Sequence, residues 1–81
     1  MVGRLLERLK LVVAVSEEIP VEAKLHLQPM IQDMTSILSA PEAEQDQARV
    51  GGYYHSLLET SEDDPDVVAL LSAVRNFVSY L

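Results

Sequence analysis

The chain has 81 residues, of which 48% are hydrophobic and 23% charged, and it contains no cysteine. This size and balance predict one folded domain over residues 1–81, near the lower limit for a core without disulfide bonds or a structural zinc site. The formal net charge of −7 argues against nucleic acid as the partner, because binding to phosphates needs a basic face.

The first predicted helix covers about Val2 to Glu17. Leu11 and Val15 lie on the side that is polar one turn earlier, so the end of the helix is apolar nearly all round. This second apolar side indicates either a helix end buried between its neighbours or an exposed site for a partner. The expected core stripe has helical spacing and consists of Val2, Leu5, Leu6, Leu9, Val12 and Val13.

A second helix is predicted to begin near Pro20 and to stop before Ser39. Its apolar stripe keeps its phase through Pro29, so we expect one helix that is kinked at Pro29. Val21, Leu25 and Pro29 form a smaller stripe on the opposite side. The core stripe consists of Ala23, Leu27, Met30, Ile31, Met34, Ile37 and Leu38.

The third predicted helix starts after the signal at Pro41 and contains two adjacent glycines, Gly51 and Gly52. Two glycines inside a helix cost on the order of 2 kcal/mol relative to alanine. We expect a continuous helix in which the glycines let a neighbouring backbone approach closely, with a break at the glycines as the alternative. The apolar positions are Ala43, Val50, Tyr54, Leu57 and Leu58.

The last helix has the clearest start signal and is predicted to extend from Asp64 to Leu81. Asp64 is a good N-cap and Pro65 suits the first helical position. The apolar stripe behind this start predicts that Leu70, Val74 and Phe77 are nearly fully buried. The stripe consists of Val67, Leu70, Leu71, Val74, Phe77, Val78 and Leu81.

The sequence shows no residue pattern of an enzyme or of a metal site. His26 and His55 lie in different predicted helices, and neither has the spacing of a metal-binding pair. The acidic run over residues 62–66 lacks the spacing of a calcium loop. We therefore expect no catalytic activity, no cofactor and no metal.

The segment from Leu9 to Met34 combines a leucine-rich helix, a Ser-x-x-Ile-Pro break and a second helix that carries acids and a lysine. The residues of this pattern are Ser16, Ile19, Pro20, Glu22, Lys24 and Leu27. With this pattern the segment resembles small helical adaptor or effector-associated segments of bacterial defence and signalling proteins. The resemblance implies an adaptor or association module, and the chain departs from the pattern at Pro29 and at its two adjacent glycines. A death-fold-like bundle of six helices is a related possibility, although only four helices are counted, or five if Pro29 divides the second.

The sequence as a whole predicts an all-α fold, a small antiparallel bundle of four helices. The apolar run from Leu11 to Val15 is too short to span a membrane or to act as a signal peptide, so we expect a cytoplasmic protein. The expected function is that of a non-enzymatic protein-interaction module, which associates with itself or docks a partner.

The predicted interaction residues are Leu11, Val15, Val21 and Leu25, which flank one junction between helices. A homodimer is the expected form, because two-fold pairing needs only one patch. The structural alternative is that the ends of the last two helices cover these residues.

Two other functions remain open at this point. The first is a small regulator or chaperone of a secretion or toxin system that binds a partner helix in a groove. The second is a helical bundle that binds a small molecule near Met30, Met34 and Tyr54.

Overall fold

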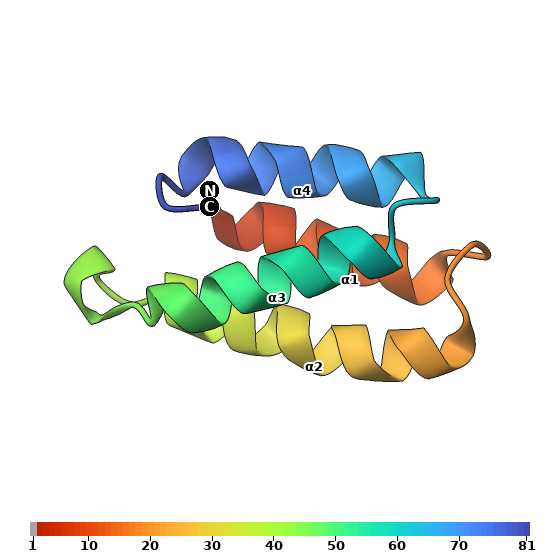
Figure 1. The fold of residues 1–81 in the computed structure, drawn as a ribbon, viewed down its shortest axis with the longest axis horizontal. Helices are drawn as coiled ribbons and strands as arrows, with labels where there is room; N and C mark the ends of the chain where they lie inside the picture. Colours follow the sequence, from red (N-terminus) through yellow and green to blue (C-terminus); the bar gives the residue numbers. More distant parts are fainter. Residues whose placement is uncertain (1) are drawn as a thin grey trace.

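The computed structural model describes residues 2–81, and over these residues it contains four α-helices, one short 3-10 helix and no strand (Figure 1). The prediction of an all-α chain with four helices is confirmed. Met1, the first residue of the predicted domain, lies outside the described residues. The elements are α1 (Val2–Val15), α2 (Val21–Leu38), η1 (Glu42–Glu44), α3 (Gln47–Thr60) and α4 (Pro65–Phe77).

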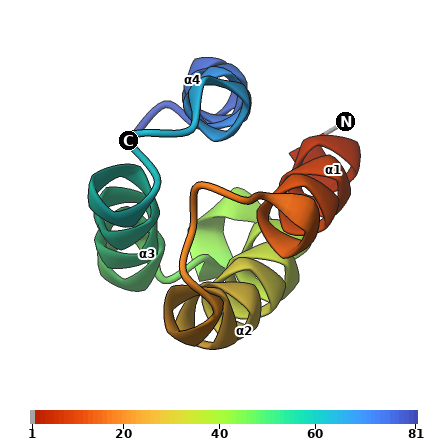
Figure 2. The same ribbon diagram turned by 90° about the vertical axis from the view of Figure 1, so that its right-hand side faces the viewer.

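The helices surround a common centre in an elongated molecule of 37 × 20 × 19 Å (Figure 2). Helix α1 packs closely against α2 and α4, and α2 also packs against α3, whereas α3 contacts α4 at few positions. The α1–α2 turn (residues 16–20) and the α3–α4 turn (residues 61–64) lie at one end of the molecule, which we name the turn end (Figure 1). The start of α1, η1 and the end of the chain lie at the opposite end.

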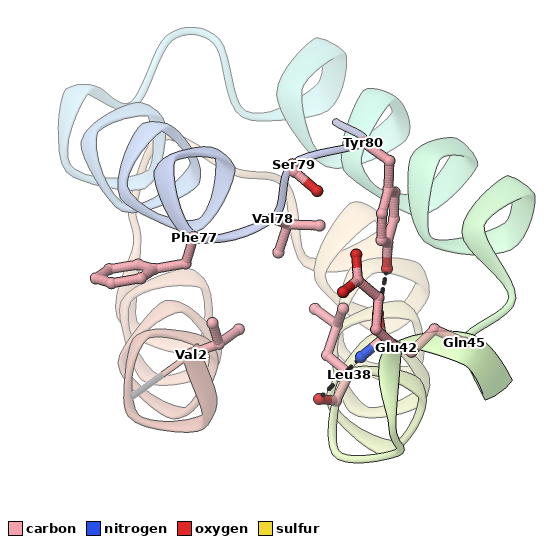
Figure 3. A pocket seen from close by; sticks show the side chains of 8 residues that line it. All are labelled: Val2, Leu38, Glu42, Gln45, Phe77, Val78, Ser79 and Tyr80. Carbon is pink, nitrogen blue, oxygen red and sulfur yellow. Dashed lines mark hydrogen bonds between the residues drawn. The ribbon is translucent and has the colours of Figure 1, made fainter.

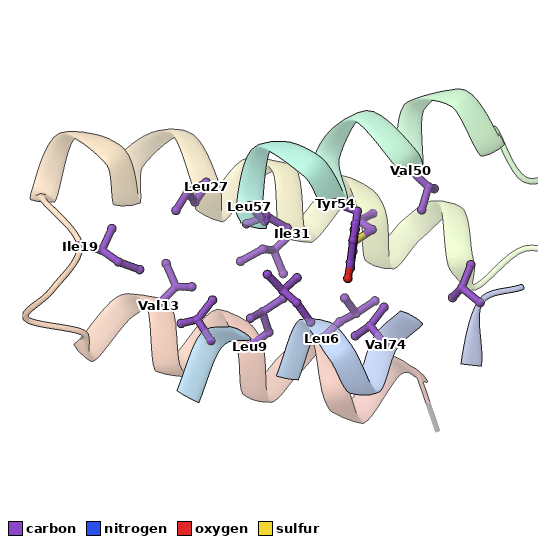
Figure 4. Close-up of a cluster of buried hydrophobic side chains, with 14 residues drawn as sticks. Leu6, Leu9, Val13, Ile19, Leu27, Ile31, Val50, Tyr54, Leu57 and Val74 are labelled. Atoms are coloured by element: carbon purple, nitrogen blue, oxygen red, sulfur yellow. The ribbon is translucent and has the colours of Figure 1, made fainter. Parts of the chain in front are cut away.

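Each α-helix supplies three buried apolar side chains to one core (Figure 4). Ile19 joins this core from the α1–α2 turn and is 3% exposed, as expected for an apolar residue just before a helix start. Complete burial of such side chains contributes about 1.5–3 kcal/mol each. The core consists of Leu6, Leu9, Val13, Ile19, Leu27, Ile31, Met34, Val50, Tyr54, Leu57, Val67, Leu71, Val74 and Val78.

The first two helices have nearly the predicted extents. Helix α1 ends at Val15, two residues before the predicted Glu17. Helix α2 continues through Pro29, as predicted from the unbroken phase of its stripe. Proline has no N–H, so the carbonyl of Leu25 lacks its usual donor four residues later. The bend that we expect at Pro29 stays a prediction.

The predicted start of the third helix and the predicted role of its glycines are wrong. Residues 42–44 form the separate η1, and α3 begins only at Gln47, where the carboxylate of Asp46 accepts a hydrogen bond from the Arg49 N–H at 3.2 Å. The helix is continuous through Gly51 and Gly52, as predicted. However, a Cβ at either glycine would have no atom within 4 Å, so no neighbouring backbone approaches there.

The start of α4 agrees with the sequence signal. Pro65 is the first helical residue, and the Asp64 side chain caps the helix. Its Oδ1 accepts hydrogen bonds from the N–H groups of Asp66 at 3.0 Å and Val67 at 3.3 Å. These bonds satisfy two of the backbone donors that a helix start leaves without partners.

The end of α4 differs from the prediction, because the helix stops at Phe77 and does not continue to Leu81. Val78 has an extended backbone, with φ −114° and ψ 106°, and its side chain is buried. Phe77 was predicted to be buried but is 53% exposed, Leu70 is half-buried, and only Val74 is fully buried. Of the last two predicted stripe residues before Leu81, only Val78 contributes to the core.

Candidate interaction surface

Large exposed apolar side chains are concentrated on the two helix segments that flank the α1–α2 turn. Among residues 2–81, the large hydrophobic side chains that are exposed are Leu11 at 67%, Val15 at 76%, Val21 at 70%, Leu25 at 68% and Phe77 at 53%. The first four are the predicted interaction residues, which we name the apolar corner. They lie on the last turns of α1 and the first turns of α2. The alternative in which the ends of α3 and α4 cover them is wrong.

Helical geometry explains why these side chains point away from the core. Leu11 lies two residues from both Leu9 and Val13, so it is rotated by about 200° from these two buried residues. Leu25 has the same relation to the buried Leu27 on α2. The apolar corner is therefore a second apolar face, separate from the face that each helix gives to the core.

The α1–α2 turn beneath the corner is held by a buried polar contact. The Ser16 hydroxyl donates to Asp64 Oδ2 at 2.5 Å and accepts from the Glu18 N–H at 3.2 Å. Ser16 and Asp64 are each 7% exposed. The hydrogen bond from Ser16 lowers the pKa of Asp64 most, burial opposes this effect, and the N–H groups of Val67 and Asp66 add to the lowering. The turn is thus tied to a carboxylate that stays charged at neutral pH.

A second contact joins the two helices that carry the corner. The Lys24 ammonium on α2 donates to the Ala14 carbonyl in the last turn of α1 at 3.2 Å. A cation at this position also interacts favourably with the negative end of the α1 dipole. The two halves of the apolar corner are therefore held on helices that are tied together beside it.

The apolar corner continues along α2 as a face without charge. Pro29, Gln32 and Ser36 are exposed and lie on the same side of α2 as Val21 and Leu25. The charged residues of α2 lie to either side of this strip. An uncharged strip of this kind can pack against another surface without the desolvation of charged groups.

Another polar cluster connects α2 to α3. The Tyr53 hydroxyl donates to Asp33 Oδ2 at 2.5 Å, and the Arg49 guanidinium lies 3.7 Å from both Asp33 and Asp46. The hydrogen bond to Asp33 is the main cause of a raised pKa of Tyr53, and burial and the charge of Asp33 add to it. Each of these groups has a structural partner, and the cluster fixes the start of α3 against α2.

A pocket of about 220 Å³ lies at the end of the molecule opposite the turn end (Figure 3). On its wall the Tyr80 hydroxyl donates to Gln45 Oε1 at 2.8 Å, and Gln45 Nε2 donates to the Ala40 carbonyl at 2.9 Å. These bonds tie the end of the chain to the α2–α3 connection. In Figure 3 the ring of Phe77 points away from Tyr80, with Val78 between them. The lining residues are Val2, Leu38, Glu42, Gln45, Phe77, Val78, Ser79 and Tyr80.

A second pocket, of about 290 Å³, lies between α1 and α4 and is lined by Arg8, Val12, Asp66, Ala69 and Leu70. Neither of the two pockets is lined by the residues predicted to bind a small molecule. Met34 and Tyr54 are 0% and 5% exposed and pack within the core, and Met30 is half-buried beside it.

The titratable residues do not come together in a metal site within residues 2–81. His26 and His55 are both exposed, and no group of three or more His, Asp or Glu side chains in this range could hold a metal ion. In the same range, no helix combines the length and the apolar character that crossing a bilayer requires.

No protein family, curated protein or solved structure matches the chain. The resemblance of the segment from Leu9 to Met34 to bacterial adaptor segments therefore stays a prediction. What the protein does has to be inferred from its own surfaces.

Proposed function

We propose that the protein is a non-enzymatic protein-interaction module that associates with a second copy of itself through the apolar corner. The observation that carries this proposal is the exposure of large apolar side chains: four of the five among residues 2–81 lie at this corner. Single exposed apolar residues are ordinary, whereas a contiguous apolar patch is typical of an association site.

A second copy is the simplest partner, because its binding needs no surface other than the apolar corner. In a two-fold dimer each patch pairs with the same patch of the other copy, so the apolar corner is sufficient for both sides. The pairing would bury four large apolar side chains from each copy, and full burial contributes roughly 1.5–3 kcal/mol for each. This gain is of the size needed to offset the roughly 4–15 kcal/mol that association costs in lost freedom of motion.

The scaffold in this proposal is an antiparallel bundle of four helices in which Pro29 bends α2. The close packing of α1 against α2 and α4, and of α2 against α3, supports the arrangement. The bend is supported by the missing N–H of Pro29, which removes the hydrogen bond to the Leu25 carbonyl. Such a bend would tilt the first turns of α2, and with them one half of the apolar corner.

The proposed setting is the cytoplasm, in a bacterial defence or signalling system. The support for this setting is the resemblance of the α1–α2 segment to adaptor segments of such systems, and the contacts within the chain add nothing to it. The interaction itself can be tested without knowledge of the setting.

The test is sedimentation velocity over a wide range of protein concentration, on the unmodified chain and on the variant Leu11→Glu with Leu25→Glu. We expect the unmodified chain to shift from monomer to dimer with increasing concentration and the variant to remain monomeric. Because both residues are exposed, the variant should keep the far-ultraviolet circular dichroism of the parent.

The matched control is Ser72→Glu with Phe77→Glu, which also adds two charges and removes one large exposed apolar side chain. These residues lie on α4, outside the corner, so the control should dimerise like the parent. A parent chain that is monomeric at all concentrations, or a folded Leu11 and Leu25 variant that still dimerises, would contradict the proposal.

A further inference from the structure

We propose that the second copy binds antiparallel along α1, so that the basic first half of one α1 lies against the acidic α1–α2 turn of the other. This arrangement rests on the proposed self-association and specifies its geometry. It follows from the order of exposed residues along α1 and its turn: a first half with three bases and one acid, then an apolar stretch, then an acidic turn. The residues are Arg4, Glu7, Arg8, Lys10, Leu11, Val15, Glu17 and Glu18.

This order is self-complementary only when the two copies run in opposite directions. Arg4 precedes Leu11 by seven residues, and Glu18 follows Leu11 by seven. At about 1.5 Å per helical residue, Arg4 lies about 10 Å from Leu11 along α1. Val15, the last residue of α1, lies about 6 Å beyond Leu11 in the other direction, and Glu17 and Glu18 follow it in the turn. A two-fold axis near Leu11 therefore brings Arg4 of one copy toward the acidic turn of the other. Parallel pairing would instead place bases against bases and acids against acids.

The charges at both ends of this strip have no ion-pair partner among the described residues, 2–81. Over residues 2–81 the ion pairs are those of Arg49 with Asp33 and Asp46, and none involves the basic or acidic ends of the strip. Arg4 and Arg8 are both exposed, so their charges are accessible to a partner.

The overall charge favours the same arrangement. Two copies with a formal charge of −7 repel each other unless their contact brings a basic segment against an acidic one. The chain has six Lys and Arg residues, and three of them, Arg4, Arg8 and Lys10, lie in the first ten positions. Antiparallel contact along α1 uses this basic segment on both copies and sets it against the acidic α1–α2 turn.

Charge reversal tests the arrangement by sedimentation. At about 0.05 M salt, where surface charges are weakly screened, Arg4→Glu with Arg8→Glu should raise the dimer dissociation constant about tenfold or more. Adding Glu17→Lys and Glu18→Lys to this variant exchanges the two ends of the strip and should restore dimerisation to within about threefold of the parent.

The matched control changes the net charge by the same amount away from the strip. Ser72→Glu, Arg75→Glu and Asn76→Glu together also make the net charge more negative by four, all at exposed positions of α4. This control should weaken the dimer less than the reversal at Arg4 and Arg8. An equal effect of both variants would show that only net charge matters and would overturn the antiparallel arrangement.

Cross-linking gives a second measurement, because the chain has no cysteine of its own. Arg4→Cys mixed with Glu18→Cys should give a covalent dimer with a short bismaleimide, whereas Arg4→Cys alone should not. Cross-linking of Arg4→Cys alone would show parallel pairing and overturn the proposal.

The two proposals fail in different ways. The parent could form a dimer that Leu11→Glu with Leu25→Glu abolishes and charge reversal leaves unchanged. That result would support the corner as the interface and would exclude the antiparallel arrangement. A parent that never dimerises excludes both proposals.

Discussion

The hydroxyl of Ser16 and the carboxylate of Asp64, which are 48 positions apart, form a buried hydrogen bond of 2.5 Å. The two oxygens of this carboxylate accept hydrogen bonds from different segments. Oδ2 accepts from Ser16 in the α1–α2 turn, and Oδ1 accepts from the backbone at the start of α4. One side chain therefore caps a helix and also joins the two turns at the turn end.

We expect Asp64→Ala to lower the free energy of unfolding by about 2–4 kcal/mol. The loss combines an N-cap, at about 0.5–2 kcal/mol, with a buried hydrogen bond to a charged group, at about 1.5–3 kcal/mol. Ser16→Ala should cost less, because the cap of α4 remains. Urea unfolding followed by circular dichroism measures both. Equal losses for the two variants would show that the cap contributes nothing measurable.

The stability of the protein should fall in acid partly through Asp64. Its pKa in the folded protein is lowered below the ordinary value of 3.8, mainly by the hydrogen bond from Ser16. A lowered pKa contributes stability above the unfolded-state value, and this contribution is lost as the pH falls through the folded-state value. Asp64→Asn should therefore lose less stability than the parent between about pH 5 and pH 2. Urea midpoints across this range measure the difference, and parallel curves would contradict it.

Two substitutions in α4 should differ in their cost to the free energy of unfolding, because one residue is in the core and the other is on the surface. Leu71 is fully buried, so Leu71→Ala should cost about 2–5 kcal/mol. Phe77 is half exposed, so Phe77→Ala should cost clearly less than the roughly 3–5 kcal/mol of a buried phenylalanine. Chemical denaturation of both variants makes the comparison. A larger loss for Phe77→Ala would mean that α4 continues into the core beyond Phe77.

Replacement of the two glycines in α3 should stabilise the protein. A Cβ at Gly51 or Gly52 would have no atom within 4 Å, and neither glycine has a positive φ. Each change to alanine should add about 0.5–1 kcal/mol, because alanine loses less backbone freedom on folding. Thermal unfolding should show a rise of several degrees for the double variant. An unchanged or lower midpoint would show that the space around the glycines is needed.

The periodicity of apolar residues predicted the four helices and the outward position of the apolar corner, because both depend only on spacing within one helix. Leu11 and Leu25 could be recognised since each lies opposite a core stripe on its own helix. The same reasoning failed at Phe77, because spacing does not reveal where a helix stops. Both Phe77 and Val78 belong to the predicted stripe, but only Val78, the first residue after the helix, is buried.

Contacts between distant segments could not be predicted from the sequence in this way. The sequence predicts Asp64 as a helix cap and places Ser16 near the end of the first helix, but nothing local pairs the two residues. The hydrogen bond between Gln45 and Tyr80 likewise depends on how the end of the chain folds back. The absence of neighbours around the glycines of α3 also depends on the spacing between helices, which a single sequence does not give.

The placement of Val2 and Leu81 has a practical consequence for any tethered form of this protein. Both lie at the end of a 37 Å long molecule that is opposite the turn end (Figure 1). A fluorophore, a surface linker or a fused domain after Leu81 would therefore leave the apolar corner accessible, whereas one before Val2 would stand next to Arg4, inside the proposed contact. The chain can be immobilised through its C-terminus, and its association can still be measured in that form.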